Sequence, residues 1–384
     1  MKTIEPYTGF EQGPIRPPSE AGSLLIRITR NCPWNRCTFC PVYKGTPFSL
    51  RPVAHVLKDI DKVNFYVDSI LNAQRTNGRV AQSSYASISS SPDDLDRMAL
   101  HAARNFVASG MKSIFLQDGN SLIIKPDDLV TILENLKQAF PDVERVTSYA
   151  RSHTIARINE DDIRRFAEAG LNRIHIGMES GADAVLKKVK KGTDKATQVL
   201  AGQKIKRAGM ELSEYYMPGL GGRKLLRENA LETADALNQI NPDFIRLRTL
   251  ALPEGTPLAE QYKTGEFDKM GEVETAQELL LFLDSLNGIE STIKSDHVLN
   301  LFSEVEGKLP QDKEKMTAPV REFLELSPQQ QMVFSIGRRS HQLSTLADLD
   351  DPIKYRYAER MCSELGATID NVNDIVDSFI KQFI

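Results

Sequence analysis

The sequence predicts an α/β fold built on a parallel sheet. Six short apolar or β-branched runs recur along the first two thirds of the chain, and a longer helical pattern follows each one. The predicted strands are 24–29, 113–117, 145–149, 173–178, 211–217 and 244–249. Right-handed helical crossovers curl such a sheet into a complete or partial barrel, with functional loops at the carboxyl ends of the strands.

The helical patterns lie between these strands and continue beyond the last one. They are predicted near 53–76, 93–109, 126–139, 161–169, 182–189, 194–208 and 223–239. Serine-rich residues 83–91 suggest a loop, either a plain connector or a flap at a substrate entrance. We therefore expect an N-terminal arm (1–22), a barrel (23–250) and a mainly helical C-terminal extension (251–384) with one strand near 291–298.

Composition limits the class of protein. The chain has 384 residues, is 41% hydrophobic and 26% charged, and carries a net charge of -4. This balance is typical of a globular protein and gives no basic field that would favour nucleic acid. The longest apolar run, 279–283, is too short to span a membrane, and the N-terminus has no signal-peptide pattern. We expect a cytoplasmic protein.

Three of the four cysteines lie within nine residues, directly after the first predicted strand. Cys32, Cys37 and Cys40 have the spacing C-x4-C-x2-C. This clustering is wrong for a disulfide framework and typical of a metal or cluster site in a reducing compartment. Thiolates are the soft ligands that iron–sulfur clusters need, and three of them leave one iron of a four-iron cluster open to chemistry.

The motif resembles that of radical S-adenosylmethionine (SAM) enzymes, which usually have C-x3-C-x2-C after the first strand of a partial (β/α)6 barrel. An aromatic residue commonly precedes the last cysteine, and Phe39 stands there in this chain. The longer first gap resembles one branch of the superfamily with the pattern C-x4-C-T-F-C, related to proteins similar to oxygen-independent coproporphyrinogen oxidase. The resemblance implies a [4Fe–4S] cluster on the three cysteines and SAM as the second cofactor.

The resemblance also implies positions for SAM. The family uses reductive cleavage of SAM to form a 5′-deoxyadenosyl radical that abstracts hydrogen from the substrate, and a low-potential donor such as flavodoxin or ferredoxin supplies the electron. The positions that match the family's SAM contacts lie at the ends of three strands: Gln117, Asp118, Gly119 and Asn120; Ser148 and Arg151; and Glu179. Each also has a structural interpretation, because Asp118-Gly119 is a common turn and Glu179 stands beside a helix-capping pair.

Alternation along the strands predicts which side chains face the barrel interior. Since Ile245 and Leu247 should face helices, Arg246 and Arg248 should face inward. The same argument sends inward Arg27, Thr29, Arg173, His175, Gly177, Glu179, Glu214 and Tyr216. We expect a wet cavity that holds SAM and a small or medium-sized, polar or anionic substrate bound by these arginines. Alternatively, the charges form a structural network, for example between Glu214 and Arg246.

Two other classes of protein remain open. A plant-type [2Fe–2S] electron carrier would need a fourth cysteine, and only Cys362 is available, which we expect to be a buried core residue. A structural zinc site would need a histidine such as His55 beside the cysteines. A small-molecule substrate is favoured over RNA, since the chain has no second cysteine cluster and no basic patch.

Overall fold

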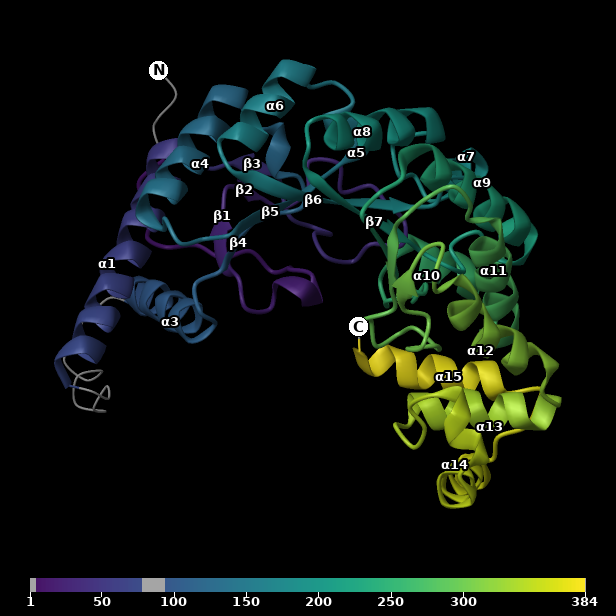
Figure 1. Cartoon of the computed structure of the whole chain (residues 1–384). Coiled ribbons are helices and arrows are strands. Elements are labelled where there is room, and N and C mark those ends of the chain that lie inside the picture. Colours follow the sequence, from purple (N-terminus) through teal and green to yellow (C-terminus); the bar gives the residue numbers. More distant parts are fainter. Residues whose placement is uncertain (1–4, 78–93, 384) are drawn as a thin grey trace. The chain divides into compact units, whose positions relative to one another are not determined.

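The protein is described here by a computed structural model covering residues 5–77 and 94–383 (Figure 1). The serine-rich segment 83–91 lies outside these residues. The chain divides into two compact units. The N-terminal unit contains Met1–Pro33, Val42–His175 and Arg207–Glu211, and the C-terminal unit contains Trp34–Pro41, Ile176–Lys206 and Leu212–Ile384.

The sheet of the N-terminal unit has the strand order β1-β4-β5-β6. Its strands are β1 (Leu24–Arg27), β4 (Ser113–Gln117), β5 (Arg145–Ala150) and the first residues of β6 (Leu171–Glu179). β1 pairs with β4, and β4 with β5, in parallel. In this register Leu25, Phe115 and Thr147 lie side by side on one face of the sheet. A short antiparallel ladder joins β2 (Thr29–Arg30) to β3 (Ser49–Leu50).

The helices of the N-terminal unit are η1 (Pro18–Glu20), α1 (Val53–Asn77), α3 (Asp94–Ala108), η2 (Ser121–Ile123), α4 (Pro126–Ala139), α5 (Ser152–Ile155) and α6 (Glu160–Glu168). Sequence signals mark the starts of two of them, α4 and α6. Proline occupies the first position of α4, where its missing N–H costs nothing. The Asn159 side chain accepts from the N–H of Asp161 and caps α6. Leu129, Ile132 and Leu133 give α4 its buried face.

The sheet of the C-terminal unit has the order β6-β7-β8-β9-β10. β7 (Glu211–Tyr216), β8 (Phe244–Leu247) and β9 (Thr292–Lys294) are parallel, and β10 (Gly307–Lys308) is antiparallel to β9. The crossover helices of this unit are α7 (Asp183–Lys188), α8 (Lys195–Arg207), η3 (Arg223–Leu225) and α9 (Leu226–Ile240). A side chain at Gly181 would overlap the backbone of Glu232 and Thr233, so glycine lets the chain approach α9 closely.

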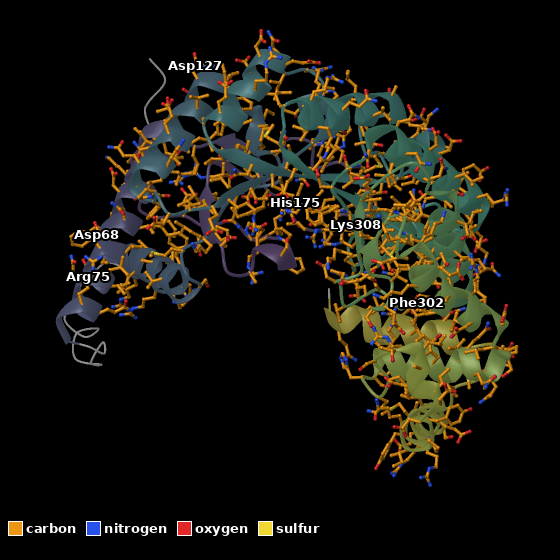
Figure 2. The ribbon with its side chains drawn as sticks, viewed as in Figure 1. Asp68, Arg75, Asp127, His175, Phe302 and Lys308 are labelled. Atoms are coloured by element: carbon orange, nitrogen blue, oxygen red, sulfur yellow. The ribbon has the colours of Figure 1, made fainter. Side chains whose placement is uncertain are left out.

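The segment after residue 251 is mainly helical. Its helices are α10 (Pro257–Lys263), α11 (Glu272–Ser285), α12 (Lys313–Glu325), α13 (Pro328–Arg339), η4 (Leu346–Asp350), α14 (Pro352–Glu364), α15 (Val372–Ile380) and η5 (Lys381–Phe383). Phe302, labelled in Figure 2, packs with its ring centre 5.4 Å from that of Phe323 and 6.0 Å from that of Phe334. A buried ion pair between Arg339 and Glu272 joins α13 to α11.

The predicted α/β class with a mostly parallel sheet is confirmed, and β9 lies inside the strand predicted near 291–298. The division at residue 250 stays a prediction. No helix among the described residues is long and apolar enough to cross a membrane.

The alternation predicted for β7 is wrong. The Tyr216 hydroxyl donates to Glu278 of α11 at 2.6 Å, and its ring centre lies 4.2 Å from that of Phe282. Tyr216 therefore faces a helix, and Glu214, two residues earlier, shares that face. The register agrees, because Tyr216 pairs with Leu247 and Glu214 with Ile245. A shift of one residue in the assumed phase moves every side chain of a strand to the other face.

Candidate active site

The cysteine loop begins directly after β2. Cys32 lies in the N-terminal unit, and Cys37 and Cys40 lie in the C-terminal unit, where they pack against its apolar core. All three are half-buried thiols rather than halves of disulfides. Backbone hydrogen bonds fix the loop, because Thr38 donates to the carbonyl of Val189 and accepts from the N–H of Leu258, both at 3.0 Å. Cysteine thiolates are the ligands that iron–sulfur clusters use.

Gly119, at the end of β4, lies against the first cysteine. A Cβ atom built on Gly119 would be 3.2 Å from Cε2 of Tyr43 and 3.7 Å from Cβ of Cys32. Gly119 is half-buried, whereas Gln117, Asp118 and Asn120 are completely buried. Of these four predicted residues, Gly119 therefore has its backbone accessible beside Cys32.

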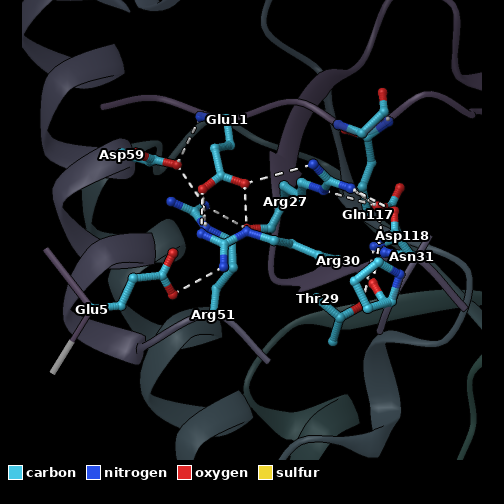
Figure 3. Close-up of polar contacts among 12 residues, drawn as sticks. Glu5, Glu11, Arg27, Thr29, Arg30, Asn31, Arg51, Asp59, Gln117 and Asp118 are labelled. Carbon is cyan, nitrogen blue, oxygen red and sulfur yellow. Dashed lines mark hydrogen bonds and ion pairs between the residues drawn. The ribbon is translucent and has the colours of Figure 1, made fainter. Parts of the chain in front are cut away.

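The side chains of Gln117 and Asp118 are engaged by the protein itself (Figure 3). Gln117 accepts from the N–H of Gly13 at 2.8 Å and donates to the carbonyl of Ile15 at 2.6 Å. The Oδ2 atom of Asp118 accepts from Nε of Arg27 at 2.8 Å and from the N–H of Asn31 at 3.1 Å. These contacts fix the N-terminal arm and the start of the cysteine loop.

The arm adds a network of carboxylates and arginines that sequence reasoning missed (Figure 3). Glu11 lies 3.6 Å from Arg27, 2.5 Å from Arg30 and 3.4 Å from Arg51. Arg51 also pairs with the completely buried Asp59 at 2.6 Å. Burial alone would raise the pKa of Glu11, but Arg30, Arg51 and Arg27 lower it below its usual value. The sequence does contain one signal for this network, the density of arginines around β1 and β2, because so many positive charges require carboxylates nearby to compensate them.

At the end of β5, the protein engages two more of the predicted positions. The Asn120 side chain accepts from the N–H of Arg151 at 2.9 Å and donates to Oγ1 of Thr154 at 2.8 Å. Ser148 is completely buried, and its hydroxyl donates to the carbonyl of Leu116 at 3.3 Å. Arg151 is half-buried. The contacts of Asn120 thus hold the ends of β4 and β5 together.

In the C-terminal unit, Glu179 forms an ion pair with Lys191, with Oε1 and Nζ 3.1 Å apart. The backbone of Glu179 has a φ of 65°, in the left-handed region that costs a non-glycine residue free energy. A side chain at Gly177 would overlap Oε1 of Glu179, so glycine makes room for the pair. Lys191 was missed, because the run of lysines at 187–191 is typical of a solvated helix surface.

Phe39 connects this pair to the cysteine loop. Its ring is buried in the core of the C-terminal unit, with Val185, Leu220 and Leu252 among its members. Nζ of Lys191 lies 5.8 Å from the centre of the Phe39 ring. Cation–π attraction at this distance holds the lysine over the residue that precedes Cys40.

Glu214 is completely buried, and neither carboxyl oxygen has a hydrogen-bond partner among the described residues. Burial raises its pKa well above the usual value; Lys191 lowers it and Glu179 raises it, and burial dominates. Burial thus favours the neutral carboxyl group, because an unpaired charge inside the protein would cost free energy.

Arg246, in β8, and Arg248, one residue after the strand, have different surroundings. Arg246 is 5% exposed, forms an ion pair with Asp296 and donates to the Ser213 hydroxyl at 3.2 Å. Its partner is thus Asp296 and not Glu214. Arg248 is half-buried, with its guanidinium carbon 5.1 Å from the centre of the Tyr215 ring. Burial and the nearby Arg248 charge lower the pKa of His297 to about 4, so His297 is neutral at pH 7.

The other interior charges also have protein partners. Arg173 donates to Glu211 at 2.9 Å, and Nε2 of His175 lies 3.8 Å from Glu20. The structural network that the sequence left open as an alternative is therefore present for Arg27, Arg173 and Arg246.

The residues on which the rival classes depend lie in apolar or aromatic surroundings. Cys362 is 3% exposed in α14, as predicted, and burial raises its pKa to about 11. His55 packs edge-on against Tyr7, with ring centres 5.4 Å apart. Across 5–77 and 94–383, no three His, Cys, Asp or Glu side chains converge to hold a single metal ion.

Comparison with known proteins identifies relatives for part of the chain. Over 129 residues it is 28% identical to a tRNA uridine(34) acetyltransferase of Methanocaldococcus infernus, a match that covers 33% of this chain and 24% of the relative. The corresponding enzyme of Methanocaldococcus jannaschii is 27% identical over 133 residues, with the same coverage. The match thus spans about a quarter of the length of these relatives.

Among solved structures, the chain is similar to coproporphyrinogen III oxidase of Escherichia coli, which is a radical SAM enzyme. The alignment covers 68% of this chain and 52% of the oxidase, with 16% sequence identity and a TM-score of 0.44. The sequence model of the family described as the radical SAM superfamily matches residues 26–234, which is more than half of the 384 residues. The chain therefore belongs to the radical SAM superfamily.

Proposed function

We propose that Cys32, Cys37 and Cys40 bind the [4Fe–4S] cluster that radical SAM enzymes use together with SAM. The observation that supports this proposal is the position of Gly119, whose accessible backbone at the end of a strand lies beside the side chain of Cys32. When bound and reduced, the cluster and SAM supply the 5′-deoxyadenosyl radical that removes hydrogen from the substrate. The chain's own residues bind, orient and shield these groups.

SAM contacts divide between backbone and side chains. At the end of β4, the side chains of Gln117, Asp118 and Asn120 are hydrogen-bonded to other groups of the protein. We therefore assign the SAM contact at this strand end to the backbone of Gly119. Glu179 is the ribose-binding candidate, and Lys191 orients its carboxylate through the 3.1 Å ion pair. The strained backbone of Glu179 supports this role, since such strain is concentrated at functional sites.

The substrate proposed is small or medium-sized, polar and anionic. Arg248 supports the proposal of an anionic substrate, because it is half-buried on the same face of the chain as Arg246. Arg246 itself is already neutralised by its ion pair with Asp296. A guanidinium suits bidentate contact with carboxylate or phosphate. Replacing Arg248 by Met should weaken substrate binding while the melting temperature stays within a few degrees of the wild type.

A tRNA substrate is the second candidate. It is favoured by the two relatives, which are named as tRNA-modifying enzymes. The net charge of -4 argues against it, since RNA affinity depends on contacts between basic side chains and phosphates. Gel-shift titrations with bulk tRNA at two salt concentrations distinguish the candidates: tight binding that weakens steeply with salt supports tRNA.

Reductive cleavage of SAM tests the proposed function. The protein reconstituted anaerobically should bind four irons and four sulfides and, with dithionite, slowly convert SAM to 5′-deoxyadenosine and methionine. A bound [2Fe–2S] cluster or zinc, with no cleavage, would instead favour the electron-transfer or zinc-binding alternative. Cysteines kept as thiols fit a reducing, cytoplasmic location for such a cluster.

A further inference from the structure

An open recess of about 540 Å³ lies beside the cysteine loop, entirely within the C-terminal unit. Trp34 and Arg36 form one wall, and the other is formed by α7 and the loop that follows it, including Lys187 and Lys190. Since Arg36 is bonded directly to Cys37, this recess opens next to one of the proposed cluster ligands.

Trp34 is held rigidly in this wall. Its indole N–H donates to the carbonyl of Lys190 at 2.7 Å. A side chain at Gly192 would overlap the indole ring, so glycine lets the loop pack directly on it. The guanidinium of Arg36 lies 5.1 Å from the ring centre. A fixed aromatic ring with an arginine on it is the kind of group that dominates protein–protein interfaces.

The recess has excess positive charge. Arg36, Lys187 and Lys190 are exposed and form no ion pair within the described parts of the chain. The two carboxylates at its rim are engaged locally: Asp183 accepts from the N–H of Lys195 at 2.7 Å and Asp194 from the N–H of Thr197 at 2.8 Å. The three cations are therefore available to an acidic partner.

We propose that this recess docks an acidic one-electron donor protein of the flavodoxin or ferredoxin type. This inference rests on the proposed function, which requires an electron from outside. The donor loses one electron and the cluster gains it, and no bond is made or broken. Complementary charge raises the rate of encounter with such a partner, and the interfaces of redox pairs are small, as this recess is.

RNA is a poorer occupant. The rim carboxylates, Asp183 and Asp194, would face its phosphates, and three cations provide few of the contacts on which RNA affinity depends. An acidic protein surface can instead place neutral groups opposite Asp183 and Asp194.

Trp34 is the single tryptophan of the chain and provides a direct probe. Protein labelled with 5-fluorotryptophan should give one fluorine resonance, and titration with an oxidised bacterial flavodoxin should shift or broaden it at low salt. The double variant Lys187→Glu/Lys190→Glu should bind flavodoxin at least tenfold more weakly, with a shallower salt dependence. The binding measurement does not depend on catalysis.

The matched control is Lys137→Glu/Lys315→Glu, which changes the net charge equally at exposed positions of α4 and α12. It should bind flavodoxin like the wild type, and both variants should cleave SAM normally with dithionite. An unchanged affinity of Lys187→Glu/Lys190→Glu, an equal loss in the control, or a Trp34 shift produced by tRNA but not by flavodoxin would each overturn the proposal. Failure of the wild type to cleave SAM with dithionite would instead count against the proposed function.

Discussion

Glu20 in the N-terminal unit and Glu214 and Glu278 in the C-terminal unit are buried carboxyl groups whose pKa values shift in opposite directions. In the N-terminal unit, burial would raise the pKa of Glu20, but the nearby His175 ring, a hydrogen bond from Ser23 and the charge of Arg145 lower it below its usual value. In the C-terminal unit, Glu214 and Glu278 are completely buried and form no ion pair among the described residues, and burial raises the pKa of both. The surroundings in the N-terminal unit therefore favour the charged form of Glu20, whereas burial in the C-terminal unit favours the neutral form of Glu214 and Glu278.

This contrast extends to the residues near the cysteines. Near Cys32, the side chains of Asp118 and Gln117 hold the N-terminal arm and the start of the cysteine loop in place. The region around Cys32 is therefore a rigid support. Around Cys37 and Cys40, Glu179 and Lys191 keep 14% and 13% of their side chains exposed. We infer that substitutions near Cys32 act first on stability, whereas substitutions near Glu179 act first on ligand binding.

The largest effect on stability is expected for Asp118→Asn. Asp118 is completely buried and its carboxylate pairs with Arg27, whose side chain is 14% exposed. Removing one partner of a buried ion pair leaves the other charge uncompensated, at a cost of about 3–5 kcal/mol. Urea unfolding of the cluster-free protein should show this loss.

The control for Asp118 is Asp127→Asn in the same unit. Asp127 also pairs with an arginine, Arg165 at 2.6 Å, but its side chain is 86% exposed, so little change in stability is expected. Equal losses in the two variants would mean that the region near Cys32 is not a buried support.

The second largest expected effect is a pH dependence of the free energy of unfolding, which comes from Glu278 in the C-terminal unit. Burial raises the pKa of Glu278 from 4.5 to about 7, against hydrogen bonds from Tyr216, Gly219 and Asn229 that lower it. The folded state then binds a proton that the unfolded state has lost, so this stabilisation is complete below about pH 4.5 and disappears as the pH rises through 7. The difference amounts to about 3 kcal/mol. Glu278→Gln should remove this slope between pH 4.5 and 7, and an unchanged slope in urea unfolding would contradict the assignment.

A smaller effect, on affinity rather than stability, is expected for Glu179→Gln. Losing a charged acceptor for a desolvated ribose should weaken SAM binding by about 1–3 kcal/mol, measured by calorimetry on the reconstituted protein. The melting temperature without SAM should fall less than for Asp118→Asn, because Glu179 keeps 14% of its side chain exposed whereas Asp118 keeps none. Unchanged affinity with a lower melting temperature would make Glu179 a structural residue and would remove the contrast between the units.

Much of the fold could be predicted because local signals agree with it. The predicted strand 113–117 coincides with β4, since an apolar run there lies between turn residues. Strand β7 shows where this logic fails. Its ionisable Glu214 suggested an inward face, but the protein buries this residue on the face of Tyr216, which lies against α11, and burial raises the Glu214 pKa.

The candidate site was predictable only where its residues are close in sequence or match a family motif. The three cysteines and Glu179 belong to this class. Glu11, Asp59 and Lys191 could not be predicted, because each pairs with a residue that the pattern of apolar and polar positions does not reveal. Glu11, for example, pairs with Arg51, which is forty residues away in the sequence. Contacts of this kind depend on how the elements pack, which no single-sequence pattern specifies.

Cluster content of single cysteine variants tests the central claim most directly. After anaerobic reconstitution, Cys32→Ala, Cys37→Ala and Cys40→Ala should each lose the charge-transfer absorption and bound iron, although Cys32 belongs to one unit and the other two to the second. Cys362→Ala should retain four irons and four sulfides, since this thiol is buried in α14. A cluster that survives the loss of Cys32, or disappears with Cys362, would contradict the account.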